Sequence, residues 1–93
     1  LQKHPFFRAN LYESLLDGGN FELANFESAN LTRVNFRGAS LIGTNFKNSN
    51  LYEADFTGAN ILNANFEGAN LSYTIWYNGK NCKLGSVGKC DYE

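Results

Sequence analysis

The sequence predicts an all-β solenoid, in which the chain turns a corner every five residues and completes a four-sided coil every twenty. Two observations predict this fold. A large apolar residue recurs at every fifth position from Phe6 to Trp76, and a small residue stands two positions before nearly all of them. A period of five matches neither the roughly 3.6 residues of a helical turn nor the roughly 2 of a strand, so neither element could keep these residues on one side.

A typical repeating unit holds a small residue, then almost always Asn or Asp, then the large apolar residue and two variable ones. About fifteen such units follow one another without a gap. Leu15 and Ile75 replace the polar residue of their units. A unit this short cannot bury an apolar face alone, so we expect each unit to form one side of a coil that stacks on its neighbours.

Residues twenty apart are expected to lie one above another, about 4.8 Å apart. Two of the resulting four columns hold a single residue type, and identical side chains fill a shaft of constant cross-section without voids. The predicted core columns are Phe6, Phe26, Phe46 and Phe66; Leu11, Leu31, Leu51 and Leu71; Leu16, Phe36, Phe56 and Trp76; and Phe21, Leu41 and Ile61.

The unit resembles that of the pentapeptide-repeat family, in which Asp or Asn precedes Leu or Phe and a small residue precedes both. The resemblance runs from about His4 to Asn78 and is to cyanobacterial and plastid members with a two-cysteine C-terminal cap. It implies a right-handed quadrilateral β-helix of about four coils, with the small and the large residue of each unit inside. The implied domains are an N-terminal extension over residues 1–3, the solenoid over 4–78 and a C-terminal cap loop over 79–93.

Both ends of a solenoid need a cover, because the core and the backbone ladder stop there. At the C-terminal end we expect Trp76 and Tyr77 to cover the last coil, with Leu84 or Val87 folding back to help. At the N-terminal end Pro5 removes one backbone donor, which blunts an exposed edge.

Cys82 and Cys90 are the only cysteines, and both fall in the glycine-punctuated loop after the last repeat. We expect a disulfide, which would contribute roughly 2–3 kcal/mol by closing the loop; two free thiols in a cytoplasmic protein are the alternative. A disulfide favours an oxidising compartment, and the family resemblance suggests the periplasm or the thylakoid lumen. Because the chain has no Met and only three residues precede the first unit, either a segment before Leu1 is expected, namely a secretory signal, a cap or another domain, or the N-terminal end is only lightly capped.

The composition excludes several classes of function. At 93 residues with 43% hydrophobic residues in so regular a pattern, the chain is expected to form one domain. No apolar run approaches the roughly 20 residues of a membrane span. The net charge of −1 argues against nucleic-acid binding, which needs a clustered basic surface.

The repeats carry no pattern typical of an enzyme, and no cofactor is expected. Ser86 lies between two glycines of the loop, but no strand–turn–helix context supports a nucleophile there. The carboxylates fall on outward positions, where a solvated charge is the default. A metal site is not expected, because His4 is the only histidine and lies far from both cysteines in the sequence.

One apolar stripe is expected on the exterior, formed by Leu23, Ile42 and Leu62. Either the C-terminal tail or a neighbouring molecule in a crystal covers this stripe, or the stripe is a surface for a partner protein. Charged residues fall in files of alternating sign, which predicts cross-strand pairs of about 0.2–1 kcal/mol each. The two files are Glu27, Lys47 and Glu67, and Glu13, Arg33 and Glu53.

Charge is also uneven along the predicted axis, since the first coils are acidic and the tail carries Lys80, Lys83 and Lys89. This asymmetry predicts weak end-to-end self-association that salt would weaken.

The predicted function is a non-catalytic structural or protein-interaction module, with a protein partner that the sequence does not identify and no small-molecule substrate. The alternative is a DNA mimic that inhibits a topoisomerase such as gyrase, which the family resemblance brings in and which requires a long acidic rod. About four coils of mixed charge fit that function poorly. An ice-binding surface would need a flat file of threonines, and the threonines here fall in different columns or point inward.

Overall fold

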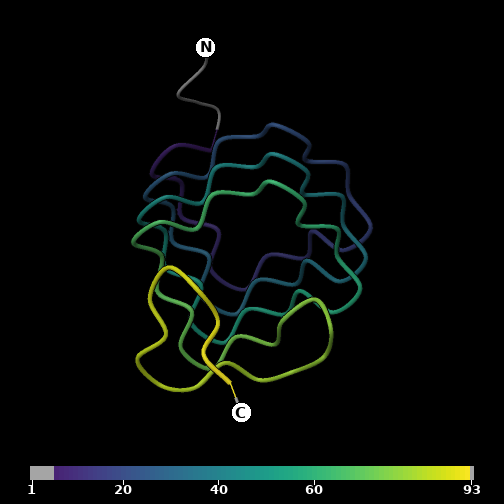
Figure 1. The fold of residues 1–93 in the computed structure, drawn as a ribbon. Coiled ribbons are helices and arrows are strands. Elements are labelled where there is room, and N and C mark those ends of the chain that lie inside the picture. The colour runs from purple at the N-terminus through teal and green to yellow at the C-terminus, as the bar shows by residue number, and fades with distance from the viewer. Residues whose placement is uncertain (1–5, 93) are drawn as a thin grey trace.

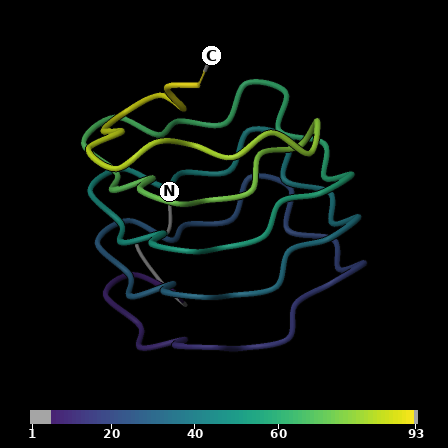
Figure 2. The ribbon, with the colours of Figure 1, turned by 90° about the horizontal axis from the view of Figure 1, so that it is seen from below.

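Residues 6–92 are described in the computed structural model of the chain. They wind into stacked four-sided coils, which Figure 1 shows nearly along the axis and Figure 2 from the side. In these residues there is no helix, and the β-structure consists of isolated bridges rather than longer strands. The predicted extension over residues 1–3 and the residues His4 and Pro5 lie outside the described part.

Parallel bridges join each coil to the next at an offset of twenty residues. The first bridge runs from Asn10 to Asn30 and the last from Asp55 to Ile75. Bridging residues recur at every fifth position, so each coil has four sides. The offset agrees with the sequence-based prediction, because four units of five residues close one coil.

A hydrogen bond made by the side chain of the second residue explains why Asn and Asp recur at that position of the unit. The side-chain oxygen of this residue accepts a hydrogen bond from the backbone N–H two residues later, as Asn45 does from Lys47 at 2.9 Å. The same bond forms in every other unit that carries Asn or Asp at this position between Asn10 and Asn70. The side chain thus turns the corner and satisfies a backbone donor that the neighbouring coils do not reach.

The remaining backbone donors of a unit bond within the corner or to the coils on either side. In the unit of residues 44–48, the N–H of the first residue donates within the corner, and the N–H of the second donates to a carbonyl of the preceding coil. The N–H groups of the third and fifth residues donate to carbonyls of the following coil. These N···O distances are 2.7 to 3.1 Å. All five donors of this unit are therefore satisfied, so the coil can be packed between two others without an unpaired N–H.

The fifth residue of each unit from Arg8 to Tyr73 has a left-handed backbone conformation. Its φ is about +60° even where the residue is Glu13, Arg33 or Tyr73. Glycine adopts this conformation without a steric penalty, whereas other residues are held there at a cost. Five of the nine glycines occupy this position, at residues 18, 38, 43, 58 and 68.

The large residues of the units fill the centre of the coils. Rings of one column stack, with centroids 5.3 Å apart for Phe26 and Phe46 and 5.0 Å apart for Phe46 and Phe66. Such pairs contribute about 0.5–1.5 kcal/mol beyond the burial of their area. The fully buried members of the columns are Phe26, Phe36, Phe46, Phe56, Leu31, Leu41, Leu51 and Leu71. The partly buried members, which lie toward the two ends, are Phe6, Leu11, Leu16, Phe21, Ile61 and Trp76.

After the last repeat the chain turns back and runs antiparallel across the last coil (Figure 2). Asn81 bridges to Ile75, and Val87 bridges to Asn70. Figure 1 shows this tail at the lower left, away from the coil segments along the top. The tail therefore covers only part of the C-terminal end.

The residues that the tail buries differ from those expected. Cys82 and Ser86 are buried, whereas Leu84 is 70% and Val87 62% exposed, so the expectation that one of these two covers the coil is wrong. Val87 directly follows an inward residue of an extended segment and so points outward. Leu84 lies at a turn.

Candidate functional site

The apolar stripe lies on the side of the solenoid that residues 21–24, 41–44 and 61–64 form. The Leu23 N–H donates to Ile42 O at 2.9 Å in the next coil, whose Gly43 N–H donates to Leu62 O at 2.8 Å. Leu23 and Leu62 are 80% and 61% exposed, and Ile42 is half-buried. The described part of the tail leaves both leucines open to solvent, so the expectation that the tail covers the stripe is wrong.

Leu23 lies over the backbone of the next coil because that coil has no side chain in the way. A Cβ at Gly43 would come within 2.7 Å of the Leu23 Cδ2 atom. The glycine thus provides the space in which Leu23 rests while most of its side chain stays exposed. The stripe continues from there through Ile42 to Leu62.

An open hollow of about 460 Å³ adjoins the C-terminal end of the stripe. It is lined by Ala59, Asn60, Ile61, Leu62 and Tyr77. Ile61 belongs to a core column, but it is only partly buried, whereas the leucine twenty residues before it is fully buried. The hollow and the stripe share Leu62, so together they form one apolar surface.

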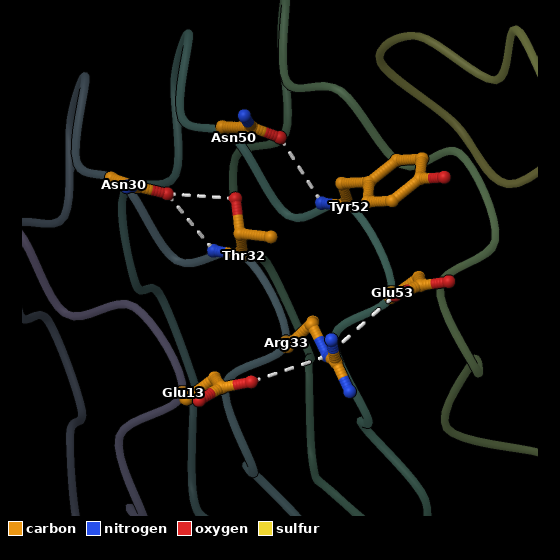
Figure 3. A network of polar contacts seen from close by, with 7 residues as sticks. All are labelled: Glu13, Asn30, Thr32, Arg33, Asn50, Tyr52 and Glu53. Atoms are coloured by element: carbon orange, nitrogen blue, oxygen red, sulfur yellow. Dashed lines mark hydrogen bonds and ion pairs between the residues drawn. The ribbon is translucent and has the colours of Figure 1, made fainter.

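A file of charged side chains occupies another side of the solenoid. Arg33 Nε lies 3.5 Å from Glu13 Oε2 and 3.7 Å from Glu53 Oε1, so one arginine connects three coils (Figure 3). All three side chains are about half exposed, and such pairs contribute about 0–1 kcal/mol each. The alternating signs predicted for this file are present, and they leave this side without a field of one sign.

Asp55 takes the Asn position of its unit and adds a charge there. Its Oδ1 accepts hydrogen bonds from the Thr57 N–H at 2.9 Å and hydroxyl at 2.6 Å, and its Oδ2 lies 3.1 Å from Arg37 Nη1. Partial burial alone would raise the pKa of Asp55, but the bonds from Thr57 and the Arg37 guanidinium together outweigh it and hold this pKa below its ordinary value. The arrangement stabilises the ionised carboxylate between two coils and does not prepare it to donate a proton.

Cys82 and Cys90 form a disulfide, with an S–S distance of 2.01 Å. The buried Cys82 is itself paired with the last coil, because its N–H donates to Thr74 O at 2.8 Å and its carbonyl accepts from the Tyr73 N–H at 3.0 Å. The disulfide therefore fixes the outer part of the tail to the segment that caps the coil.

Other chemistry finds no support in the described residues. None of residues 6–92 forms a cluster of three His, Cys, Asp or Glu side chains that could hold a metal ion. The Ser86 hydroxyl donates to Lys83 O at 2.8 Å and accepts from the Asp91 N–H at 3.0 Å, which makes it part of the fold of the tail. The described part of the chain also has no helix with the length and apolarity needed to cross a membrane.

The sequence pattern places Ile61 in a core column and therefore does not predict the hollow beside it. A signal was present. The residue twenty positions later is Asn81, which is not apolar, and the turn dipeptide Asn78-Gly79 comes just before it. Both features indicate that no further unit covers Ile61.

These observations define the chain as a β-solenoid with a five-residue unit and four sides. The chain belongs to the pentapeptide repeat family, whose repeat model matches residues 6–41 and 35–72 with 8 copies. Members of this family are generally non-catalytic repeat proteins. Membership of the family implies a right-handed β-helix.

Several solved structures are similar to this chain, among them two pentapeptide repeat proteins. A pentapeptide repeat protein of the Arabidopsis thaliana thylakoid lumen has a TM-score of 0.76 at 25% identity, over 91% of this chain and 59% of that one. HetL, a pentapeptide repeat protein involved in heterocyst differentiation regulation in the cyanobacterium Nostoc, has a TM-score of 0.40 at 25% identity, over 77% of this chain and 42% of that one. The chain thus spans less than two thirds of the length of either protein. No curated protein matches the sequence.

Proposed function

We propose that this protein is a non-catalytic interaction module, a right-handed quadrilateral β-helix that binds a partner protein through the stripe of Leu23, Ile42 and Leu62. In this proposal residues 4–78 form the solenoid of about four coils and residues 79–93 its cap. The observation that carries the proposal is the exposure of the two leucines on a scaffold whose backbone is fixed by hydrogen bonds. Contiguous exposed apolar side chains of this kind mark interaction surfaces.

The shape of the stripe favours a protein partner over a small molecule. The stripe extends over three stacked coils, roughly 10 Å at the usual spacing between strands. A small ligand is normally enclosed in a concave site that buries most of its surface, whereas a partner protein can cover an open face.

We further propose that the protein works in an oxidising compartment, the thylakoid lumen or the periplasm. The disulfide between Cys82 and Cys90 supports this, because such bonds persist where thiols are not kept reduced. The similarity to a thylakoid-lumen protein agrees with it.

A pull-down from a lumen or periplasm extract tests the stripe. The test variant carries Leu23→Ser, Ile42→Ser and Leu62→Ser, and the control carries Tyr12→Ser and Tyr52→Ser on the side of the charged file. Circular dichroism first establishes that both variants keep the wild-type fold. We expect the wild type and the control to recover the same protein and the stripe variant to lose it. Equal recovery by all three would reject the stripe as the binding surface.

The DNA-mimic function is the alternative, and the charged file weighs against it. A DNA mimic presents rows of negative charge, but Arg33 separates Glu13 from Glu53 on this side. A gyrase supercoiling assay tests the alternative directly: inhibition by the wild-type protein would favour it over the interaction module.

A further inference from the structure

The chain leaves the solenoid one side too early to cover Ile61. Tyr77 still follows the coil, since its carbonyl accepts a hydrogen bond from the Gly58 N–H at 3.0 Å. Gly79, with a φ of +83°, then takes part in the reversal of the chain. The hollow beside Tyr77 is therefore the space that a continuing unit would have filled.

The reversal leaves hydrogen-bonding groups of the last coil open along the hollow. In the unit of residues 39–43, the third and fifth N–H donate to the next coil and the first carbonyl accepts from it. The corresponding groups of the last coil are the Ile61 N–H, the Asn63 N–H and the Ala59 carbonyl. None of these three groups has a hydrogen-bond partner among residues 6–92. The edge thus presents two donors and one acceptor in the arrangement through which each coil pairs with the next.

The tail shows what kind of group pairs with this edge. Two sides further along the same coil, the third and fifth N–H of a unit belong to Leu71 and Tyr73. They donate to Ser86 O at 2.8 Å and to Cys82 O at 3.0 Å. A segment of polypeptide, in which residues 84 and 85 form a turn, therefore already satisfies the equivalent donors elsewhere on the last coil.

We propose that the open edge binds an extended segment of a partner polypeptide, which runs parallel to residues 59–63 and places one large apolar side chain over Ile61. The backbone groups of the edge would supply affinity, and the hollow between Leu62 and Tyr77 would select the side chain, as in other additions of a strand to a sheet edge. This inference rests on the proposed function of an interaction module and deepens it by naming the chemistry of the partner.

A second copy of the solenoid does not fit this edge in register. Its first coil would have to lie over all four sides of the last coil, but the tail already bridges to Asn70 and Ile75. The side of residues 61–64 has room for a strand, whereas a complete coil would collide with the tail. The occupant that the geometry favours is therefore a single extended segment.

A peptide with the sequence of residues 39–44 is a suitable probe, because that segment pairs with residues 59–63 from the opposite edge. We expect a titration followed by NMR to shift the backbone amide signals of Ile61 and Asn63. The amide signals of Leu71 and Tyr73, which the tail already pairs, are expected to stay unchanged.

Two methylated forms of the peptide test the predicted register. The N–H of its second residue would donate to Ala59 O, so methylation of that nitrogen is expected to weaken binding about five- to tenfold. The N–H of its third residue would point away from the edge, and its methylation is the matched control that is expected to leave the affinity unchanged.

Two variants of the protein separate the hollow from the rest of the stripe. Leu62→Ser removes a side chain that lines the hollow and is expected to weaken peptide binding about tenfold. Leu23→Ser removes a still more exposed leucine two coils away and is expected to leave peptide binding unchanged.

The inference is overturned if millimolar peptide does not shift the amide signals of Ile61 and Asn63, or if both methylations weaken peptide binding equally. It is also overturned if concentrating the protein alone produces the same shifts, because the edge would then bind a second copy of the chain. Absent peptide binding together with partner capture that depends on the stripe would remove this inference and leave the proposed function standing. Peptide binding that Leu62→Ser weakens, with partner capture equal for the wild type and the Leu23→Ser variant, would instead keep the edge and remove Leu23 from the binding surface.

Discussion

Asn45 shows what the repeat requires of a single side chain. Its Oδ1 accepts the Lys47 N–H, and the other backbone donors of the unit bond to the corner or to the neighbouring coils. A residue at this position therefore needs a short side chain with an acceptor oxygen, which explains why Asn and Asp recur and why Asp55 can replace Asn. Leu15 and Ile75 lack such an oxygen, and both occur near an end of the stack.

Replacing this acceptor in the middle of the stack should cost stability. Asn45→Ala is expected to lower the free energy of unfolding by about 1 kcal/mol, because the Lys47 N–H loses its partner. Asn45→Asp keeps the oxygen and is the control, with an expected change within about 0.5 kcal/mol. Urea denaturation followed by circular dichroism measures both. Equal stability of the Ala and Asp variants would show that the bond adds nothing.

The charge of Asp55 should make the stability of the protein depend on pH. The pKa of Asp55 is lower in the folded state than in the unfolded state, so its charge stabilises the fold above the unfolded pKa of about 4. This contribution is lost as the pH falls through the folded pKa. Asp55→Asn keeps the acceptor for Thr57 but removes the charge that faces Arg37.

We therefore expect Asp55→Asn to be less stable than the wild type by about 0.5–1 kcal/mol at neutral pH, a small value because Arg37 is more than half exposed. The difference should shrink as the pH falls from about 4 through the lowered folded pKa of Asp55. Urea denaturation at a series of pH values measures it, and a difference that stays constant over the whole range would contradict the assignment.

The tail is the element that the sequence describes least. Its two cysteines and its glycines predict a closed loop, but its antiparallel path over residues 70–75 follows no period that a sequence pattern could reveal. The buried positions Cys82 and Ser86 became apparent only from the structure, because backbone pairing with the last coil, rather than hydrophobicity, decides which residues face inward.

Opening the disulfide should loosen this element before the rest. With Cys82→Ala and Cys90→Ala, we expect the free energy of unfolding to fall by about 2–3 kcal/mol. Amide hydrogen exchange at Leu71 and Tyr73, whose N–H groups the tail pairs, should accelerate more than exchange at Phe46 in the middle of the stack. The wild type in reducing buffer is the control and should behave like the variant. Uniform acceleration at all three residues would mean that the tail and the coils open as one unit.

For the whole molecule, the five-residue period determines most of the architecture, because every coil repeats the contacts of its neighbours. The columns of Phe26 and Phe46 and the offset of twenty residues could be predicted for this reason. The position of the stripe could be predicted from the sequence. Its exposure could not, because exposure depends on the path of the tail. The left-handed fifth position went unpredicted, although the recurrence of glycine there, as at Gly38 and Gly58, was a usable signal.

The crossing of the tail over the last coil also limits how far the molecule can grow. An unprotected β-edge acts as a template on which identical chains can polymerise. Here a strand added beside Ile61 would meet the disulfide-anchored tail before it could wind into another full turn. The tail therefore acts as a terminator: it permits a single addition at the end of the stack while preventing an open-ended repeat from elongating into a fibre.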